Sequence, residues 1–382
     1  MTPQRRNLVS LIDRYLKPNV LRMLERLFSK DTISPREVHH SEIRRILVIR
    51  QHDQLGDFLL ATPVLRALRE RYPDARIGLL VRDYFADVAS RVPGIDEVLV
   101  FRANLLHWTF KRFTTLWDQL RKRWDMTVVL NTVSHSLTSD VLAYLSGARY
   151  TVGSEAHVFP GCSRNFLYNV VAPLHRPPRH QTDRNLDIVR ILDADTQDLS
   201  EEIRISENEQ MSARERFSKA SLPAPLLIGM HIGAGKKPNR WPVKNFARLA
   251  EEVREKYGAE VILFWGLAEG DLCREFCRSV SFKPITMEPS SLVQLAACFS
   301  QCDAMVFNDT GVMHLAAAVG VPLVAIFGPT DPGEWMPIGK NCASIRGERG
   351  VTGNVSPEQV LRELQNLLGE KLKRSAENKS MV

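Results

Sequence analysis

Short β-branched runs alternate with helical segments of about ten to sixteen residues, and this alternation occurs twice along the chain. Such alternation is typical of parallel βαβ units. The first set contains predicted strands at 44–50, 75–81, 97–101, 126–131, 148–153 and 166–171, and a helix near 182–193 completes it. The second contains predicted strands at 225–233, 260–266, 283–287, 303–308 and 322–328, and predicted helices at 243–257, 269–280, 290–300 and 311–319. The sequence therefore predicts an α/β chain with two doubly wound, Rossmann-like domains.

The 382 residues are enough for two such domains, and shifts in composition suggest where they begin and end. The region from 193 to about 225 is acidic and polar and then contains prolines, which is typical of a passage between domains. We expect a basic amphipathic extension, two Rossmann-like domains, and a final helix with a charged tail, at 1–42, 43–205, 206–355 and 356–382. The strand ends of the two sheets are expected to face each other across a cleft.

Composition excludes several classes of protein. The apolar fraction of 44% and the charged fraction of 25% are those of an average globular chain. Six cysteines without a secretory signal at the start indicate a reducing compartment. The pairs Cys273/Cys277 and Cys298/Cys302 have helical spacing, which fits either a metal site or small buried side chains, and the spacing favours burial. No apolar stretch approaches the roughly 18 residues of a membrane span.

The net charge of +7 is concentrated at the front of the chain. Apolar residues recur there at helical spacing, and Pro18 divides them into two short amphipathic segments. A basic amphipathic helix of this kind can lie on an anionic bilayer. The alternative is that it packs on the domain behind it.

The loop after the first strand, QHDQLGD, contains a candidate general base, Asp57. The preceding Gly56 permits a close approach, and the loop lies at the edge of the sheet where ligands bind. The alternative is that Asp57 caps the following helix. His52 and Asp53 are further candidates for the same role.

The turn after the first strand of the second domain reads HIGAGKKPNRWP. Its glycines expose backbone amides, its basic side chains add full charges, and a helix start follows it. These features predict a diphosphate cradle, although a solvated basic turn is the alternative. The residues proposed for the cradle are Gly233, Ala234, Gly235, Lys236, Lys237, Asn239 and Arg240.

A third segment, NDTGVMHLAAAVGVPLVAIFGPTDP, follows another predicted strand. Asp309, Thr310 and Gly311 open a helix whose amides can bind phosphate or ribose oxygens, and His314 lies on its first turn. Alternatively, Asp309 only caps the helix and His314 bonds a backbone carbonyl.

Together, the three segments resemble glycosyltransferase family 9, the heptosyltransferases of bacterial lipopolysaccharide assembly. The resemblance runs from about Ile43 to Trp335 and implies the two-domain GT-B fold, an ADP-heptose donor, and no metal or other cofactor. It implies that Asp57 is the general base of an inverting transfer. It also implies that the cradle, the segment 309–314 and an acidic residue after Trp265-Gly266, assigned to Glu269, hold the donor.

The acceptor is expected on the first domain, near Arg50, His52, Gly56 and Arg82. Their charge suits an anionic, lipid-linked saccharide of the lipopolysaccharide core at the cytoplasmic face of the inner membrane. No nucleic-acid-binding motif occurs in the sequence, and a nucleic-acid partner is not expected. Two other functions with the same architecture are a non-catalytic nucleotide-sugar-binding protein and a nucleotide-sugar epimerase.

Overall fold

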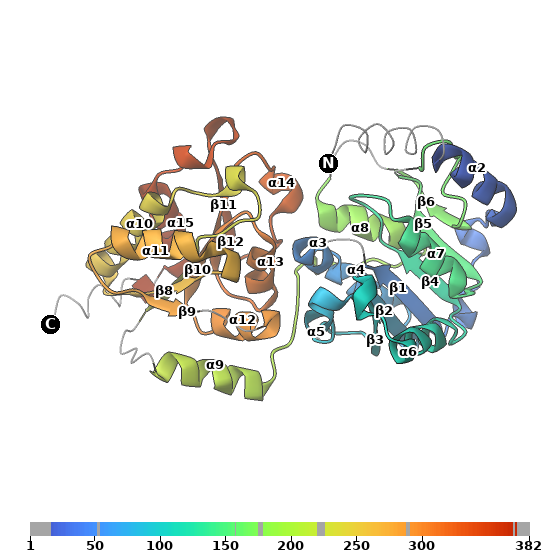
Figure 1. The fold of residues 1–382 in the computed structure, drawn as a ribbon, viewed down its shortest axis with the longest axis horizontal. Coiled ribbons are helices and arrows are strands. Elements are labelled where there is room, and N and C mark those ends of the chain that lie inside the picture. Colours follow the sequence, from blue (N-terminus) through green and yellow to red (C-terminus); the bar gives the residue numbers. More distant parts are fainter. Residues whose placement is uncertain are drawn as a thin grey trace. The chain divides into compact units, whose positions relative to one another are not determined.

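The computed structural model describes residues 17–51, 54–156, 158–174, 179–219, 226–287, 291–369 and 371–372. The chain divides into two compact units (Figure 1). Unit 1 contains residues up to 53, 63–90 and 94–197, and unit 2 contains 54–62, 91–93 and everything from 198 onward. The sequence analysis assigns 54–62, 91–93 and 198–205 to the first domain, whereas their contacts group them with unit 2.

Unit 1 is built on one parallel six-stranded sheet with the order β3-β2-β1-β4-β5-β6. Because the order reverses between β1 and β4, the carboxyl ends of these two strands form the topological switch point, where ligands bind in sheets of this type. The strands are β1 Arg45–Arg50, β2 Arg76–Arg82, β3 Glu97–Phe101, β4 Met126–Val129, β5 Tyr150–Ser154 and β6 Val170–Ala172.

Helices cover the sheet of unit 1, and β1 reads as a continuous apolar run because it is buried on both faces. One core cluster packs Leu116 and Leu120 of α6 and Leu142 of α7 against Leu47 and Ile49 of β1. The helices are α2 Lys17–Phe28, α4 Thr62–Arg71, α5 Ala86–Ala89, α6 Phe110–Leu120, α7 Leu137–Leu145 and α8 Gln181–Arg190. The described part of the unit also has 3₁₀ turns at Pro35–Glu37, His40–Glu42, Asp83–Phe85 and Leu105–His107.

Unit 2 repeats the topology with the order β12-β11-β10-β7-β8-β9, so its switch point lies between β7 and β10. Its strands are β7 Leu227–His231, β8 Glu260–Phe264, β9 Ile285–Met287, β10 Ala304–Asn308, β11 Leu323–Phe327 and β12 Cys342–Arg346. Its helices are α3 Leu55–Leu59, α9 Glu207–Lys219, α10 Val243–Tyr257, α11 Gly270–Ser279, α12 Leu292–Phe299, α13 Gly311–Ala318, α14 Pro332–Trp335 and α15 Pro357–Leu368, with 3₁₀ turns at Lys237–Asn239, Leu267–Glu269, Glu348–Gly350 and Thr352–Asn354.

The helix α10 illustrates how the sequence forms these elements. Phe246, Leu249 and Val253 recur at helical spacing and are buried in the core of unit 2. The helix ends at Gly258, whose φ of 63° places it in the left-handed region that glycine adopts without strain.

The predicted fold class is confirmed, since both sheets are parallel and doubly wound. The sixth strand of unit 1 covers 170–172 and not the predicted 166–171, and α9, α14 and β12 lie where no element was predicted. The helix α9 lies within the expected interdomain passage, where its polar sequence, ENEQMSARERFSK, buries few apolar side chains and therefore gives a weak helical pattern. The edge strand β12 was not predicted, because its residues are only partly buried and form no apolar run.

The part of the N-terminal extension that the structure describes begins at Lys17. The helix α2 packs on unit 1 through the buried Leu21, and the Arg22 Nε donates a hydrogen bond to the carbonyl of Gly161 over 3.2 Å. Its other face exposes Met23 and Leu27. Residues 1–16, which contain the first predicted amphipathic segment, lie outside the described residues. Within the described part of the chain, no helix is both long and apolar enough to cross a membrane.

Candidate functional site

The buried side chain of Asn308 joins the two loops at the switch point of unit 2. Its Nδ2 donates to the carbonyls of Ile232 at 2.8 Å and Gly233 at 3.2 Å, and its Oδ1 accepts the N–H of Trp241 at 2.8 Å. One amide at the end of β10 therefore fixes both ends of the loop that follows β7. Asn308 was not predicted as a site residue, because in the sequence it is only a polar residue at the end of a predicted strand.

The loop after β7 holds the predicted basic turn. The Arg240 Nε donates to the carbonyl of Ala234 over 2.8 Å and closes the turn. Lys236 and Lys237 are exposed. A Cβ added at Gly235 would meet nothing within 4 Å, so the backbone there is open to a ligand. Exposed amide and ammonium groups of this kind can bind a diphosphate.

Glu269 lies against the same loop. Its carboxylate accepts the N–H of Gly266 over 2.9 Å and lies 3.8 Å from Nε2 of His231. A Cβ at position 233 would overlap this carboxylate, so any larger residue there would require the Glu269 side chain to move. Burial lowers the pKa of His231, although the negative charge of Glu269 opposes that effect. The structure thus brings the predicted donor-binding residues Glu269 and Gly233 together.

The segment after β10 contributes a carboxylate and a helix start. Asp309 accepts a hydrogen bond of 2.7 Å from Nδ2 of Asn239, which links the two predicted donor-binding segments directly. The extended residue Thr310 is the N-cap of α13, and the helix begins at Gly311. The first amides of a helix have no partner within the helix, so they can bind an anion.

The short helix α3, which carries Asp57, packs on α13. A Cβ added at Gly56 would lie 2.8 Å from Cδ2 of His314, and one added at Gly311 would lie 3.3 Å from the amide nitrogen of Gly56. The two glycines therefore allow α3 and α13 to touch. As a result, Asp57 belongs to the same unit as the predicted donor-binding residues.

Asp57 also caps its own helix, because its Oδ2 accepts the N–H of Gln54 over 3.1 Å. This is the alternative role that the sequence allows. The negative charge of the half-buried Asp57 also acts on His314.

His314 is buried and pairs with a carboxylate that the sequence analysis did not identify. Its Nδ1 lies 2.7 Å from Oε1 of Glu201, which is also buried. Burial alone lowers the pKa of His314, but the carboxylates of Glu201, Asp309 and Asp57 outweigh burial and the net pKa is raised. These carboxylates therefore favour the protonated imidazole at the start of α13.

Unit 1 has a pocket of about 600 Å³. It includes Gln51, directly after β1, and His135 and Ser136, from the loop after β4, so it lies at the switch point of unit 1. Arg82 lines it, and its buried Nε has no hydrogen-bond partner among the residues that the structure describes. The other residues in the wall are Lys17, Val20, Leu21, Leu24, Phe101, Ala103, Leu137, Thr138 and Phe159.

The remaining predicted acceptor residues lie elsewhere. Arg50 is buried, and its Nη1 donates to the carbonyl of Leu130 and, at 3.4 Å, to Oγ1 of Thr132. It therefore bonds the backbone after β4 and does not line the pocket. Gly56 lies on α3 in unit 2, and His52 and Asp53 lie outside the described residues.

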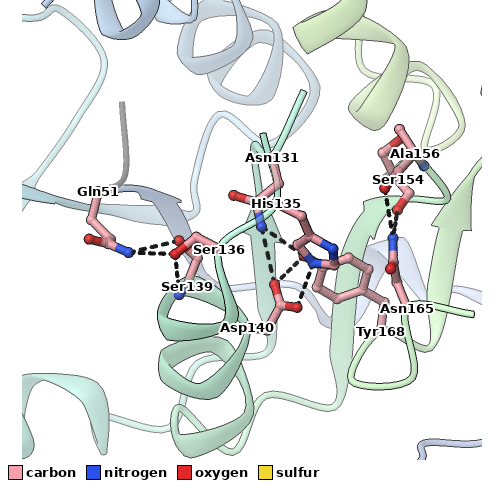
Figure 2. Close-up of polar contacts among 10 residues, drawn as sticks. All are labelled: Gln51, Asn131, His135, Ser136, Ser139, Asp140, Ser154, Ala156, Asn165 and Tyr168. Carbon is pink, nitrogen blue, oxygen red and sulfur yellow. Dashed lines mark hydrogen bonds and ion pairs between the residues drawn. The ribbon is translucent and has the colours of Figure 1, made fainter. Parts of the chain in front are cut away.

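A buried polar network supports one wall of the pocket in unit 1 (Figure 2). The Nε2 of His135 lies 2.6 Å from Oδ2 of Asp140, and the other oxygen of Asp140 accepts hydrogen bonds from the hydroxyl of Tyr168 and from Nδ2 of Asn131. Burial and the Asp140 charge raise the pKa of Tyr168 well above its ordinary value, so the phenol remains a donor. The network fixes the orientation of His135, whose ring stacks on Phe159 with centroids 4.0 Å apart.

The sequence analysis did not select His135. The available signal was its position shortly after the fourth strand, at the reversal of strand order. Among the residues that the structure describes, no group of three or more His, Cys, Asp or Glu side chains is arranged to hold a metal ion.

Comparisons with known proteins identify the family of the chain. The family model for glycosyltransferase family 9 (heptosyltransferase) matches residues 113–364. The lipopolysaccharide heptosyltransferase 2 of Escherichia coli K12 is 27% identical over 360 residues, which cover 85% of this chain and 98% of that protein.

Two solved structures share the whole architecture. A family 9 glycosyl transferase from Veillonella parvula has a TM-score of 0.75 at 25% identity, covering 86% of this chain and 97% of that one. The ADP-heptose lipopolysaccharide heptosyltransferase II of E. coli has a TM-score of 0.70 at 26% identity, covering 86% and 99%. The family match spans well over half of the sequence, so the resemblance is confirmed and the chain belongs to glycosyltransferase family 9, the heptosyltransferases.

Proposed function

We propose that the protein is an inverting glycosyltransferase that moves a heptose from ADP-heptose to an anionic, lipid-linked saccharide of the lipopolysaccharide core, with Asp57 as the general base. The observation that carries this proposal is the packing of α3 on α13. It puts Asp57 in the same unit as the cradle, Asp309 and the His314 cation.

The reaction is a single displacement. An acceptor hydroxyl oxygen attacks the anomeric carbon of the donor sugar while the bond from that carbon to the diphosphate oxygen breaks. The Asp57 carboxylate takes the hydroxyl proton, and the nucleoside diphosphate leaves with the bonding electron pair. General-base catalysis of this kind contributes about 10²–10⁴-fold to the rate.

The leaving diphosphate needs positive charge, and unit 2 supplies it in three forms. The first is the side chains of Lys236, Lys237 and Arg240, and the second is the backbone of the cradle, which is open at Gly235. The third is the start of α13, where the protonated form of His314 is favoured. We propose that these groups stabilise the diphosphate without a metal ion. Glu269 would then accept hydrogen bonds from the ribose hydroxyls.

The acceptor is assigned to the pocket of unit 1. Lys17 and Arg82 give it positive charge, and the Arg82 Nε lacks a hydrogen-bond partner there, which suits a carboxylate or phosphate on the saccharide. Phe101 and Phe159 offer apolar faces for sugar rings. We expect Arg82→Gln to raise KM for the acceptor at least about tenfold while kcat changes less, because a contact made equally in the ground and transition states affects binding alone. A fall of about tenfold in kcat with no change in the KM for the acceptor would contradict this assignment.

The donor assignment is tested by a thermal-shift panel of ADP-, UDP-, GDP- and CMP-sugars, because a ligand that binds the folded state raises its stability in proportion to RT ln(1 + [L]/Kd). We expect ADP-heptose to raise Tm most, and mass spectrometry of the acceptor to show one added heptose. A larger shift with another nucleotide would contradict the donor. Binding without any product would favour the nucleotide-sugar-binding protein, and release of a free or epimerised sugar would favour the epimerase. The cytoplasmic location follows from the use of a nucleotide-activated sugar and is part of the same proposal.

A further inference from the structure

Four large apolar side chains at and just before α6 in unit 1 point into solvent. Leu106 is 90% exposed, Phe110 is 85% exposed, Phe113 is 56% exposed and Trp117 is 41% exposed. Phe110, Phe113 and Trp117 are three and four residues apart, so they lie along one side of the helix. We refer to these four residues as the α6 stripe.

The fold of unit 1 does not require the α6 stripe. The inward residues of α6, Leu116 and Leu120, are buried in the core cluster and anchor the helix to the sheet. The stripe residues lie beside them but outside that cluster. Single exposed apolar side chains are common in proteins, whereas a contiguous row of aromatic rings marks an interaction surface.

The rings of the stripe are held in place. Phe113 and Trp117 stack with centroids 6.4 Å apart and an interplanar angle of 13°, and Trp108 meets Phe113 edge-on at 6.4 Å. The Trp108 Nε1 donates to the carbonyl of Arg102 over 2.9 Å. A pre-ordered set of rings loses little conformational entropy on binding.

The charges around the stripe are almost all positive. Residues 102–123 contain six lysines and arginines and a single acid, Asp118. Four of these basic side chains are exposed, namely Lys111, Arg112, Arg121 and Arg123. The Arg121 guanidinium lies 5.8 Å from the centroid of the Trp117 ring.

We propose that the α6 stripe is the surface by which this protein docks on an anionic membrane, with the aromatic rings in the interfacial layer and the basic side chains on lipid headgroups. Aromatic rings flanked by lysine and arginine have the composition of interfacial helices, and each basic side chain near an anionic leaflet adds electrostatic attraction. A second copy of this chain fits less well, because a symmetric contact would bring two sets of cations together.

The stripe is also close to the acceptor pocket along the chain. Ala103 lines that pocket, and Leu106 follows in the next turn. The stripe and the pocket thus share the segment that follows β3. This link to a lipid-borne acceptor rests on the proposed function, whereas docking itself does not.

The test is flotation of the full-length protein with vesicles of phosphatidylethanolamine and phosphatidylglycerol, and with vesicles of phosphatidylcholine alone. The test variant is Phe110→Glu/Phe113→Glu, which changes two exposed side chains and should leave Tm close to that of the wild type. Two matched controls place the same charge on exposed apolar side chains elsewhere, Met211→Glu on α9 and Leu27→Glu on α2. Turnover is measured in parallel with a detergent-free, delipidated acceptor saccharide and with acceptor embedded in vesicles.

We expect the wild type and both controls to float with the anionic vesicles, and the α6 variant to lose at least about tenfold in partitioning. We also expect the α6 variant to keep its turnover on the delipidated acceptor and to lose it selectively on the embedded one. Binding that survives in the α6 variant, or that is lost only in Leu27→Glu, would overturn the proposal. So would a wild type that does not bind anionic vesicles, or one that forms a dimer in ultracentrifugation that Phe110→Glu/Phe113→Glu abolishes. If the wild type and all variants lack turnover on both acceptors, while the wild type floats as expected, the proposed function fails and the docking surface stands.

Discussion

The Nδ1 atom of His314 lies 2.7 Å from Oε1 of Glu201, and both side chains are buried in unit 2. A carboxylate 113 residues earlier in the chain thus pairs with an imidazole on the first turn of α13 and favours its protonated form. The charged pair has two effects. It places a cation where a donor diphosphate is proposed to bind, and it makes the stability of the unit depend on pH.

The pH dependence has a defined sign. The folded-state pKa of His314 is raised above its ordinary value of 6.5, so its contribution to stability is fully present below that value and is lost as pH rises through the folded pKa. We therefore expect the Tm difference between the wild type and His314→Gln to be larger at about pH 6 than at about pH 9. Differential scanning calorimetry of both proteins across this range measures it.

The control for this experiment is Glu201→Gln, which removes the partner charge. We expect the pKa of His314, followed by NMR of its ring protons, to be lower in that variant than in the wild type. A Tm difference that grows with pH would show that the imidazole is held neutral.

Gly56→Ala tests the contact between α3 and α13. A Cβ at that position would press on the His314 ring, which the Glu201 bond prevents from moving away. We expect the free energy of unfolding to fall by about 1–3 kcal/mol, as for other overpacked sites. Urea denaturation measures it, with Gly235→Ala as the matched control, since that side chain would meet open space. Equal stability of the two variants would mean that α3 does not pack on α13 as described.

Asn308→Ala tests the amide that joins the two loops of unit 2. The change leaves the buried N–H of Trp241 and the carbonyl of Ile232 without the partner they have in the structure, and we expect a loss of about 2–4 kcal/mol. Asn366→Ala is the control, because Asn366 is an exposed asparagine that bonds only the neighbouring turn of its helix. If both variants unfold at the same urea concentration, the loop after β7 is held by other contacts.

The sequence predicted the elements whose signal is local. The bounds of α10 were predicted as observed, and β10 was placed within a residue, because a helix with a buried stripe and a buried apolar strand are both visible in a short window. The segments containing Gly233, Asp309 and Asp57 were found because glycines and charges directly after parallel strands mark a ligand-binding edge.

The partners of these residues were not predictable in the same way. Glu201 and Asn308 act through bonds to residues far away in sequence, and nothing within their own segments distinguishes them from surface acids or strand ends. The sequence placed 54–62 in the first domain for the same reason, whereas the contacts of this segment group it with unit 2. The segment follows β1 directly in the chain, yet its glycine packs on a helix more than two hundred residues later.

The central claim is that Asp57 removes a proton during transfer and does not serve as a helix cap alone. Asp57→Asn separates the two roles, because the asparagine oxygen can still accept the Gln54 N–H while the amide cannot act as a base. The measurement is the rate of a single turnover with saturating ADP-heptose and acceptor, together with the Kd for ADP-heptose. The account predicts that the rate falls about 10²–10⁴-fold while the Kd and Tm remain those of the wild type. A variant that turns over as fast as the wild type would contradict it.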